Sequence, residues 1–293
     1  MKRRIRMTSI ALFMAILSFP AFGGAATIGN TAISQGGSGE FSLGVEYDRV
    51  FNRDLKFKSG TRDRNDNGVI STVSFPALGD RMEDVTMESN RVLLKGTLGF
   101  HQDIDLDLFI KLGTADLRYE ENNKITGSPD QKMEFDGNFD IAWGGGAKFG
   151  FYRSPNGLRI MGDAQYLTYE VDGNFQINGI DRATFETPAT YDSKSKVEEW
   201  QAALYVLQEF KRGNPYLGIK YSDLILRNET NVSGRTAAGA PYSYKETTKA
   251  DADKNLGVFL GADINLIQNR LSINIEGRFL DETAGSIGAS YKF

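Results

Sequence analysis

The sequence predicts an all-β fold, a single antiparallel up-and-down transmembrane β-barrel of about ten strands, with eight or twelve as alternatives. Three observations lead to this prediction. Apolar residues alternate with polar ones over about 9–11 residues at a time, the length that a tilted strand needs to cross a bilayer. The connections between these segments alternate between short and long. Aromatic residues gather at the strand ends beside the short connections.

The composition agrees with a strand-rich fold and excludes several kinds of site. The chain of 293 residues contains 32 glycines, 7 prolines, 19 phenylalanines and 12 tyrosines, a mixture that suits short strands and turns. It contains no cysteine, so disulfides, thiol catalysis and lipidation of an N-terminal cysteine are excluded. The formal net charge is −4, and no basic patch indicates a nucleic-acid partner.

The first 39 residues precede the alternating pattern. Residues 1–26 have the three parts of a secretory signal peptide: a basic start at 2–6, an apolar middle at 10–19 and small residues at 24–26. Residues 27–39 are rich in glycine and serine, and we expect a flexible periplasmic lead-in there. Beyond the signal peptide no apolar run approaches the roughly 18 residues of a spanning helix. Residues 40–293 are therefore predicted to form one barrel domain.

Ten amphipathic segments make up this domain. In each of them apolar residues occupy every second position, which is the period of a strand with one apolar face. The segments are 41–47, 92–100, 106–112, 139–149, 158–166, 200–206, 217–221, 256–264, 271–279 and 286–293.

The connections are sorted by length. Short ones lie at 101–105, 152–157, 211–214 and 268–270, and longer ones at 52–86, 120–135, 171–196 and 227–254, with a brief fifth at 281–284. Asn178-Gly179 within the third long connection predicts a hairpin above the membrane; were this hairpin part of the wall, the count would be twelve. A soluble β-sandwich shows the same period of two but gives no reason for such sorting.

The C-terminal segment carries a family resemblance. Ile287, Ala289, Tyr291 and Phe293 alternate with polar residues and glycine, and the chain ends on the aromatic ring. This ending, with the signal peptide and the sorted loops, resembles the outer-membrane β-barrels of Gram-negative bacteria, on the scale of the small opacity-like and OmpA-like barrels. No motif names a subfamily.

The resemblance implies a location and partners. It places the protein in the bacterial outer membrane, with the long loops extracellular and both termini periplasmic. The expected partners are outer-membrane lipid and lipopolysaccharide, an unidentified extracellular ligand, and the barrel assembly machinery, for which Tyr291 and Phe293 are the signal. Basic residues of the first long connection are candidates for contacts with lipopolysaccharide phosphates, but they are interleaved with acids, which favours a solvated face: Arg53, Lys56, Lys58, Arg62 and Arg64.

The residues that alternate with the apolar ones along the ten segments are predicted to face the barrel lumen. Acids and bases are nearly balanced there, and charges in a confined interior need partners. Because a barrel near eight strands is only just wide enough for its own side chains, we expect a largely closed lumen filled by a charge network; a narrow pore is the alternative. The predicted network comprises Glu46, Arg91, Lys95, Asp107, Lys111, Asp140, Lys148, Arg159, Asp163, Glu199, Lys220, Asp263, Glu276 and Arg278.

Two further candidate sites need weighing. The single histidine, His101, lies in a predicted short turn at the end opposite the long loops, so it is a poor general base for a surface enzyme. Asp63, Asn65 and Asn67 match the front half of a calcium-loop pattern, but Ser74 stands where a glutamate is required. Calcium is thus a weak candidate, and we expect no other cofactor.

Two main functions remain open at this stage. The first is a non-catalytic surface barrel whose loops bind a ligand or which supports the envelope. The second is a narrow porin-like channel for small solutes. An outer-membrane enzyme is a distant third, because the chain has a single histidine and it lies at the end opposite the long loops.

Overall fold

In the computed structural model, which describes residues 40–75, 82–101, 105–123, 131–181, 188–236, 238–267 and 270–293, all regular structure is strand. The predicted signal peptide and lead-in lie outside these ranges. No helix in them is long and apolar enough to cross a membrane. The strands are β1 (Glu40–Asp66), β2 (Val69–Phe75), β3 (Met82–His101), β4 (Asp105–Asn123), β5 (Gln131–Arg153), β6 (Leu158–Ile177), β7 (Ile180–Asp181), β8 (Pro188–Gln208), β9 (Gly213–Arg235), β10 (Pro241–Ala252), β11 (Leu256–Leu266), β12 (Leu271–Phe279) and β13 (Thr283–Lys292).

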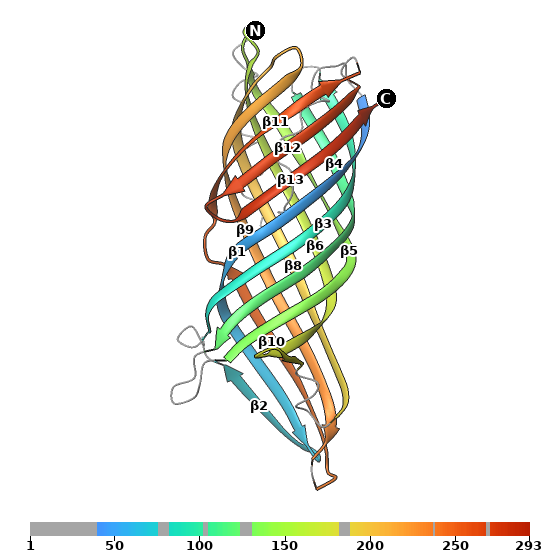
Figure 1. Cartoon of the computed structure of the whole chain (residues 1–293), viewed down its shortest axis with the longest axis vertical. Helices are drawn as coiled ribbons and strands as arrows, with labels where there is room; N and C mark the ends of the chain where they lie inside the picture. The colour runs from blue at the N-terminus through green and yellow to red at the C-terminus, as the bar shows by residue number, and fades with distance from the viewer. Residues whose placement is uncertain are drawn as a thin grey trace, which may run out of the picture.

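Ten of these strands close a barrel in which every neighbour is antiparallel. The ring runs β1, β3, β4, β5, β6, β8, β9, β11, β12, β13 and back to β1. Figure 1 shows the tilted strands, with β13 beside β1 where the barrel closes. The ten-stranded antiparallel barrel predicted from the period of two is confirmed.

The last strand closes the barrel by pairing with the first. β13 pairs with β1 on one side from Ser42↔Lys292 onward, and with β12 on the other. The backbone N–H of Phe293 donates to the carbonyl of Phe41 at 3.1 Å, and the two rings stack with centroids 5.9 Å apart. We call this end, where the short connections lie, the short-turn end.

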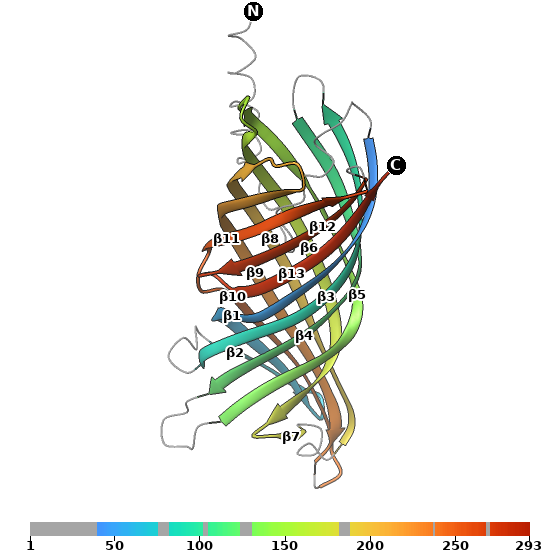
Figure 2. The ribbon, with the colours of Figure 1, turned by 45° about the horizontal axis from the view of Figure 1, so that its top comes forward.

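At the opposite end, which we call the hairpin end, the wall continues with fewer strands. β11, β12 and β13 stop early, and β10 alone fills the gap by pairing with both β9 and β1. β1 spans 27 residues, which at about 3.3 Å per residue is about 90 Å of strand, far more than a bilayer requires. Figure 2 shows the other strands continuing beyond the point where β11, β12 and β13 end. We call this continuation the extension.

The long connections are therefore largely strand, unlike the loops expected from the sequence. β1 and β2 form a hairpin over residues 60–75, and β9 and β10 form another. Asn67-Gly68 and Asn178-Gly179 turn two hairpins with positive φ at both residues, the geometry for which Asn-Gly is favoured. The Asn178-Gly179 hairpin is confirmed; β7 pairs with β6 off the ring, so it does not raise the strand count.

The apolar face switches sides between the two parts of the barrel. On β9, Leu217, Ile219 and Tyr221 face outward and are exposed, whereas Leu224 and Leu226 face inward and are buried. The same switch occurs on β1, β4, β6 and β8. An apolar outer face suits contact with lipid tails, and an apolar inner face suits a wall surrounded by water.

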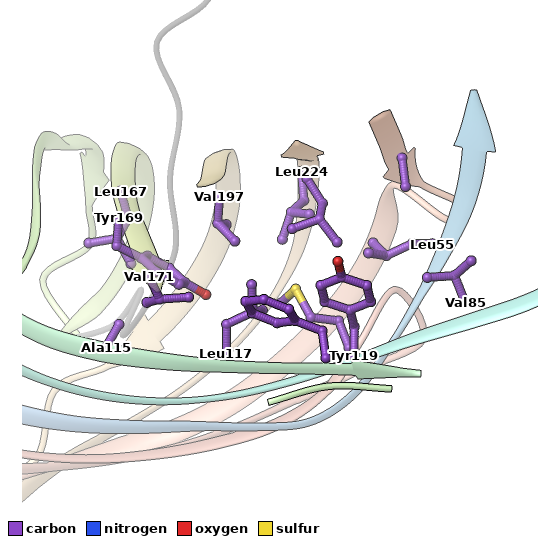
Figure 3. Packing of buried hydrophobic residues seen from close by; sticks show 14 of the residues in the cluster. Leu55, Val85, Ala115, Leu117, Tyr119, Leu167, Tyr169, Val171, Val197 and Leu224 are labelled. Carbon is purple, nitrogen blue, oxygen red and sulfur yellow. The ribbon is translucent and has the colours of Figure 1, made fainter. Parts of the chain in front are cut away.

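The switch defines an apolar belt on the ten-stranded part and an apolar core in the extension. In the extension, side chains from several strands meet inside the wall (Figure 3). Tyr119, Phe135 and Phe175 form the densest group, with ring centroids 5.0 to 5.7 Å apart. The sequence-based prediction of loops in this region thus missed an apolar core.

Candidate functional site: the barrel lumen

The ten-stranded part has a largely charged interior in which two groups stand out, beside a smaller apolar cluster on β6, β8, β9 and β11. One group, nearer the extension, is built mainly from arginines and is called the arginine cluster; the other, nearer the short-turn end, is called the lysine cluster. Each strand contributes inward side chains at every second position, so residues distant in sequence meet across the lumen. The arginine cluster comprises Asp48, Arg53, Arg91, Glu199, Lys220, Arg278, Asp281 and Glu282, and the lysine cluster Glu46, Lys95, Lys111, Lys148, Asp107 and Asp163.

Glu199 on β8 links two arginines from the opposite wall. It forms an ion pair with Arg53 of β1, and its other oxygen lies 3.0 Å from Nη2 of Arg91 on β3. All three side chains are fully buried. Since β8 is not adjacent to β1 or β3 in the ring, these bonds cross the lumen rather than run along the wall.

The turn between β12 and β13 supplies the other anions of the arginine cluster. Leu280 has a φ of 82°, a conformation that is uncommon for residues other than glycine, and the chain there turns Asp281 and Glu282 inward, where both are buried. Glu282 lies 2.5 Å from Nζ of Lys220 and 2.7 Å from Nε of Arg278. The turn is thus fixed to strands β9 and β12 by buried ion pairs.

Two further contacts extend this network to β1 and to β9. Arg278 donates to Asp48 at 2.6 Å, and Asp281 accepts from the Ser222 hydroxyl at 2.5 Å. Charge-assisted bonds of this kind are the strong ones in a protein interior. The arginine cluster is therefore a continuous network across the lumen.

The lysine cluster is held by one glutamate and one aromatic ring. Glu46 on β1 lies 3.1 Å from Nζ of Lys95 and 2.9 Å from Nζ of Lys111. The ring of Phe109 receives Lys95 at 4.7 Å and Lys148 at 6.0 Å from its centroid, within the range of cation–π attraction. Lys148 is also directly opposite Asp107 on β4 and Asp163 on β6, so three cations and three acids share this part of the lumen.

The structure places nearly all of the predicted lumen residues inside the barrel. Asp140 departs from the expectation, because its side chain is exposed and accepts a hydrogen bond from the backbone of Ile141. The register of β5 against β6 shifts between Gly137 and Ala142, and such an irregularity changes which residues face inward. The buried members are Glu46, Arg91, Lys95, Asp107, Lys111, Lys148, Arg159, Asp163, Glu199, Lys220, Asp263, Glu276 and Arg278.

Three of the most connected residues were expected in loops. Arg53 belongs to β1 and is buried, and Asp281 and Glu282 are buried as well. The signal for Arg53 is hidden by an irregularity of β1 between Val50 and Arg53, which interrupts the alternation. A carboxylate pair in a very short connection gives no pattern that distinguishes an inward turn from an exposed one.

The weak calcium candidate lies in the β1–β2 hairpin. The Asp63 carboxylate accepts from the Thr72 hydroxyl at 2.7 Å, and the Asn65 carbonyl oxygen accepts from the backbone of Gly68 at 2.8 Å. Asn67 forms the turn itself. Asp, Asn and Gly at these positions are what a tight hairpin requires, and the described residues contain no group of three His or acidic side chains placed to hold a metal.

The outer face of the extension carries a shallow polar groove. It has a volume of about 420 Å³ and crosses β2, β1, β10, β9 and β8. The cross-strand registers align two rows of outward side chains on it. Its lining includes Asp63, Asn65, Ile70, Thr190, Asp192, Asn231, Ser233, Ser243 and Lys245.

Comparison with known proteins gives structural likenesses without a family. No family model matches the chain, and no curated protein matches it. The solved structures that resemble it are outer-membrane β-barrel proteins. One is the outer membrane protein OprG from Pseudomonas aeruginosa, with 10% identity over 89% of this chain and 98% of that chain and a TM-score of 0.38. Another is the translocator domain of the autotransporter NalP from Neisseria meningitidis, with 11% identity over 98% of each chain and a TM-score of 0.39. Ail of Yersinia pestis, solved with a heparin analogue, has 11% identity over 87% of this chain and 99% of that chain, with a TM-score of 0.28.

The antiparallel barrel follows from the strand pairing of the chain itself.

Proposed function

We propose that this protein is a non-catalytic barrel of a bacterial outer membrane, closed to solutes, whose extension offers a rigid extracellular surface for binding. In this orientation the short-turn end is periplasmic and the hairpin end is extracellular. The belt of exposed apolar side chains around the ten strands supports membrane insertion, because monomeric soluble proteins rarely expose such an area. The outward polar face of the extension suits water.

The single observation that carries the closed state is the arginine cluster. Arg53, Arg91 and Glu199 are fully buried and bonded across the lumen. A second barrier follows on the extracellular side, where the aromatic rings of the extension fill its interior. A solute would have to break buried ion pairs and then enter an apolar core, and both steps are unfavourable.

Non-catalytic action is supported by the position of the only histidine. His101 is the last residue of β3, at the end that the proposal places in the periplasm. A base for chemistry on external substrates would be needed at the other end. Surface binding by the extension and mechanical support of the envelope are the roles that remain.

Conductance measurements test the closed lumen. The purified, refolded protein is expected to give no steady openings in planar lipid bilayers in which a general porin conducts. The charge-balanced variant Arg53→Ser/Glu199→Ser removes the central crossing pair, and we expect brief openings to appear. Steady ohmic conductance of the unaltered protein would contradict the proposal and favour the narrow channel.

The C-terminal ring gives a test of the proposed assembly route. Removing Phe293 takes away the backbone bond to Phe41 and the ring stacked on it, so we expect the folded protein in the outer membrane to fall several-fold. Phe210→Ala is the matched control, because Phe210 is also an exposed aromatic residue near the short-turn end. Heat-modifiable migration of membrane fractions on gels reports the folded amount. Equal effects of both changes would argue against a special role of the terminal residue.

A further inference from the structure

Three cations stand side by side on the outer face of the extension. Lys196 of β8 is directly opposite Arg227 of β9, and Arg227 is directly opposite Lys249 of β10. Their inward neighbours Val197 and Leu226 are buried, which fixes the cations on the outside. Directly opposed like charges destabilise a sheet, so the fold alone gives no reason for this row.

The nearby acids are too few to neutralise the row. Glu198 is shared by two cations, since it lies 2.9 Å from Nζ of Lys196 and also pairs with Arg227. Asp251 is likewise shared by Lys249, at 3.1 Å, and Lys58, at 3.9 Å. Glu170 of β6, which is exposed, is directly opposite Lys196. Four cations therefore share three carboxylates, and the group keeps one positive charge. We call Lys58, Lys196, Arg227 and Lys249 the cationic row.

The cations remain available to a ligand. Their side chains are 36 to 46% exposed, whereas those of Asp251 and Glu198 are only 24 and 25% exposed. Partial burial opposes ionisation of Glu198, yet hydrogen bonds from Lys196 and Arg227 hold its pKa below the usual range. Glu198 and Asp251 are thus more buried than the cations that they pair with, and the cations stay accessible to a ligand.

The row lies just beyond the membrane belt on the same strands. Trp200 of β8 and Tyr221 of β9 pack against each other with ring centroids 4.9 Å apart, and tryptophan and tyrosine are enriched at the headgroup level. Lys196 follows Trp200 by four residues towards the hairpin end, about 13 Å along the strand and about 9 Å along the membrane normal at a 45° tilt. At that depth the outer leaflet presents its headgroups.

We propose that the cationic row binds the phosphate groups of an outer-leaflet glycolipid, lipid A being the probe that represents its chemistry. The inference rests on the outer-membrane location proposed above. The acyl chains would lie against the apolar belt next to the row. The phosphates would supply the negative charge that the neighbouring carboxylates do not provide. Arginine and lysine together suit this task, because both are established phosphate binders.

The test measures binding of bis-phosphorylated lipid A to the full chain refolded in detergent, by native mass spectrometry. The variant Lys196→Gln/Lys249→Gln is expected to bind about tenfold more weakly, since each basic residue near an anionic headgroup is worth about 1 kcal/mol before screening. The matched control is Lys194→Gln/Lys245→Gln. These lysines lie on the same strands, farther from the belt, and each pairs with its own acid, Asp172 or Glu229; we expect less than a twofold change.

Two further arms identify the ligand chemistry. In the first arm, dephosphorylated lipid A is expected to bind the unaltered protein as weakly as phosphorylated lipid A binds the variant Lys196→Gln/Lys249→Gln. In the second arm, inorganic phosphate at equal concentration is expected not to displace lipid A from the unaltered protein. Equal binding of both forms of lipid A, displacement by inorganic phosphate, or equal effects of the two variants would overturn the inference. A chain that fails to insert into lipid vesicles would instead refute the outer-membrane proposal itself.

Discussion

Replacing Glu199 by alanine is expected to lower the free energy of unfolding by about 3–5 kcal/mol, the usual cost of removing one partner from a buried ion pair. Glu199 is the shared partner of Arg53 and Arg91. After its loss Arg53 keeps Glu282 at 3.5 Å, and Arg91 keeps Asp48 at 3.4 Å. Both guanidinium groups stay buried with too little negative charge nearby.

The neighbouring residue provides the control for this change. Glu198 precedes Glu199 on β8 but faces outward and pairs with partly exposed cations, and such pairs contribute about 0–1 kcal/mol. Urea unfolding of both variants in lipid vesicles, followed by tryptophan fluorescence, compares the two faces of one strand. A loss no larger for Glu199→Ala than for Glu198→Ala would show that the arginine cluster does not stabilise the barrel.

The period of two in the sequence was enough to predict the ten strands of the barrel and most of the residues that face the lumen in its ten-stranded part. It works because each strand there has one lipid face and one enclosed face. Asp140 was misplaced because the register shift beside it reverses the facing of residues, and a shift of one residue leaves no mark in composition. Asp281 and Glu282 were misplaced because an inward turn and an exposed turn use the same residue types.

The long extension was predicted as loops although the sequence contains a signal for it. On β4, Leu108, Ile110 and Leu112 face outward, and the apolar phase then changes so that Leu117 and Tyr119 face inward. A phase change within one continuous strand marks the point where the surroundings change from lipid to water. Such a change of the apolar face, present in the sequences of several strands, predicts both the extension and its apolar core.

Gly144→Ala is expected to destabilise the barrel by at least about 1–3 kcal/mol, the range for overpacking a tight interior. A Cβ at Gly144 would lie 2.0 Å from the backbone oxygen of Tyr166 on the next strand. A backbone atom of a paired strand cannot move without breaking its ladder, so the strain spreads into β5 and β6. Gly113 on β4 is equally tight, with a Cβ 1.9 Å from the Val92 oxygen.

Gly96→Ala is the matched control for this prediction. Gly96 is also a glycine in the middle of the membrane wall, but the nearest atom to its Cβ would be a side-chain carbon of Ile110 at 3.7 Å, an ordinary contact. We expect its unfolding free energy to change by no more than about 0.5 kcal/mol. If both substitutions lower the free energy of unfolding equally, the close approach of β5 and β6 is not the reason for glycine at position 144. If only Gly144→Ala is costly, the inner wall packs backbone against backbone at this point, and the narrow interior follows from strand geometry as well as from the ion pairs.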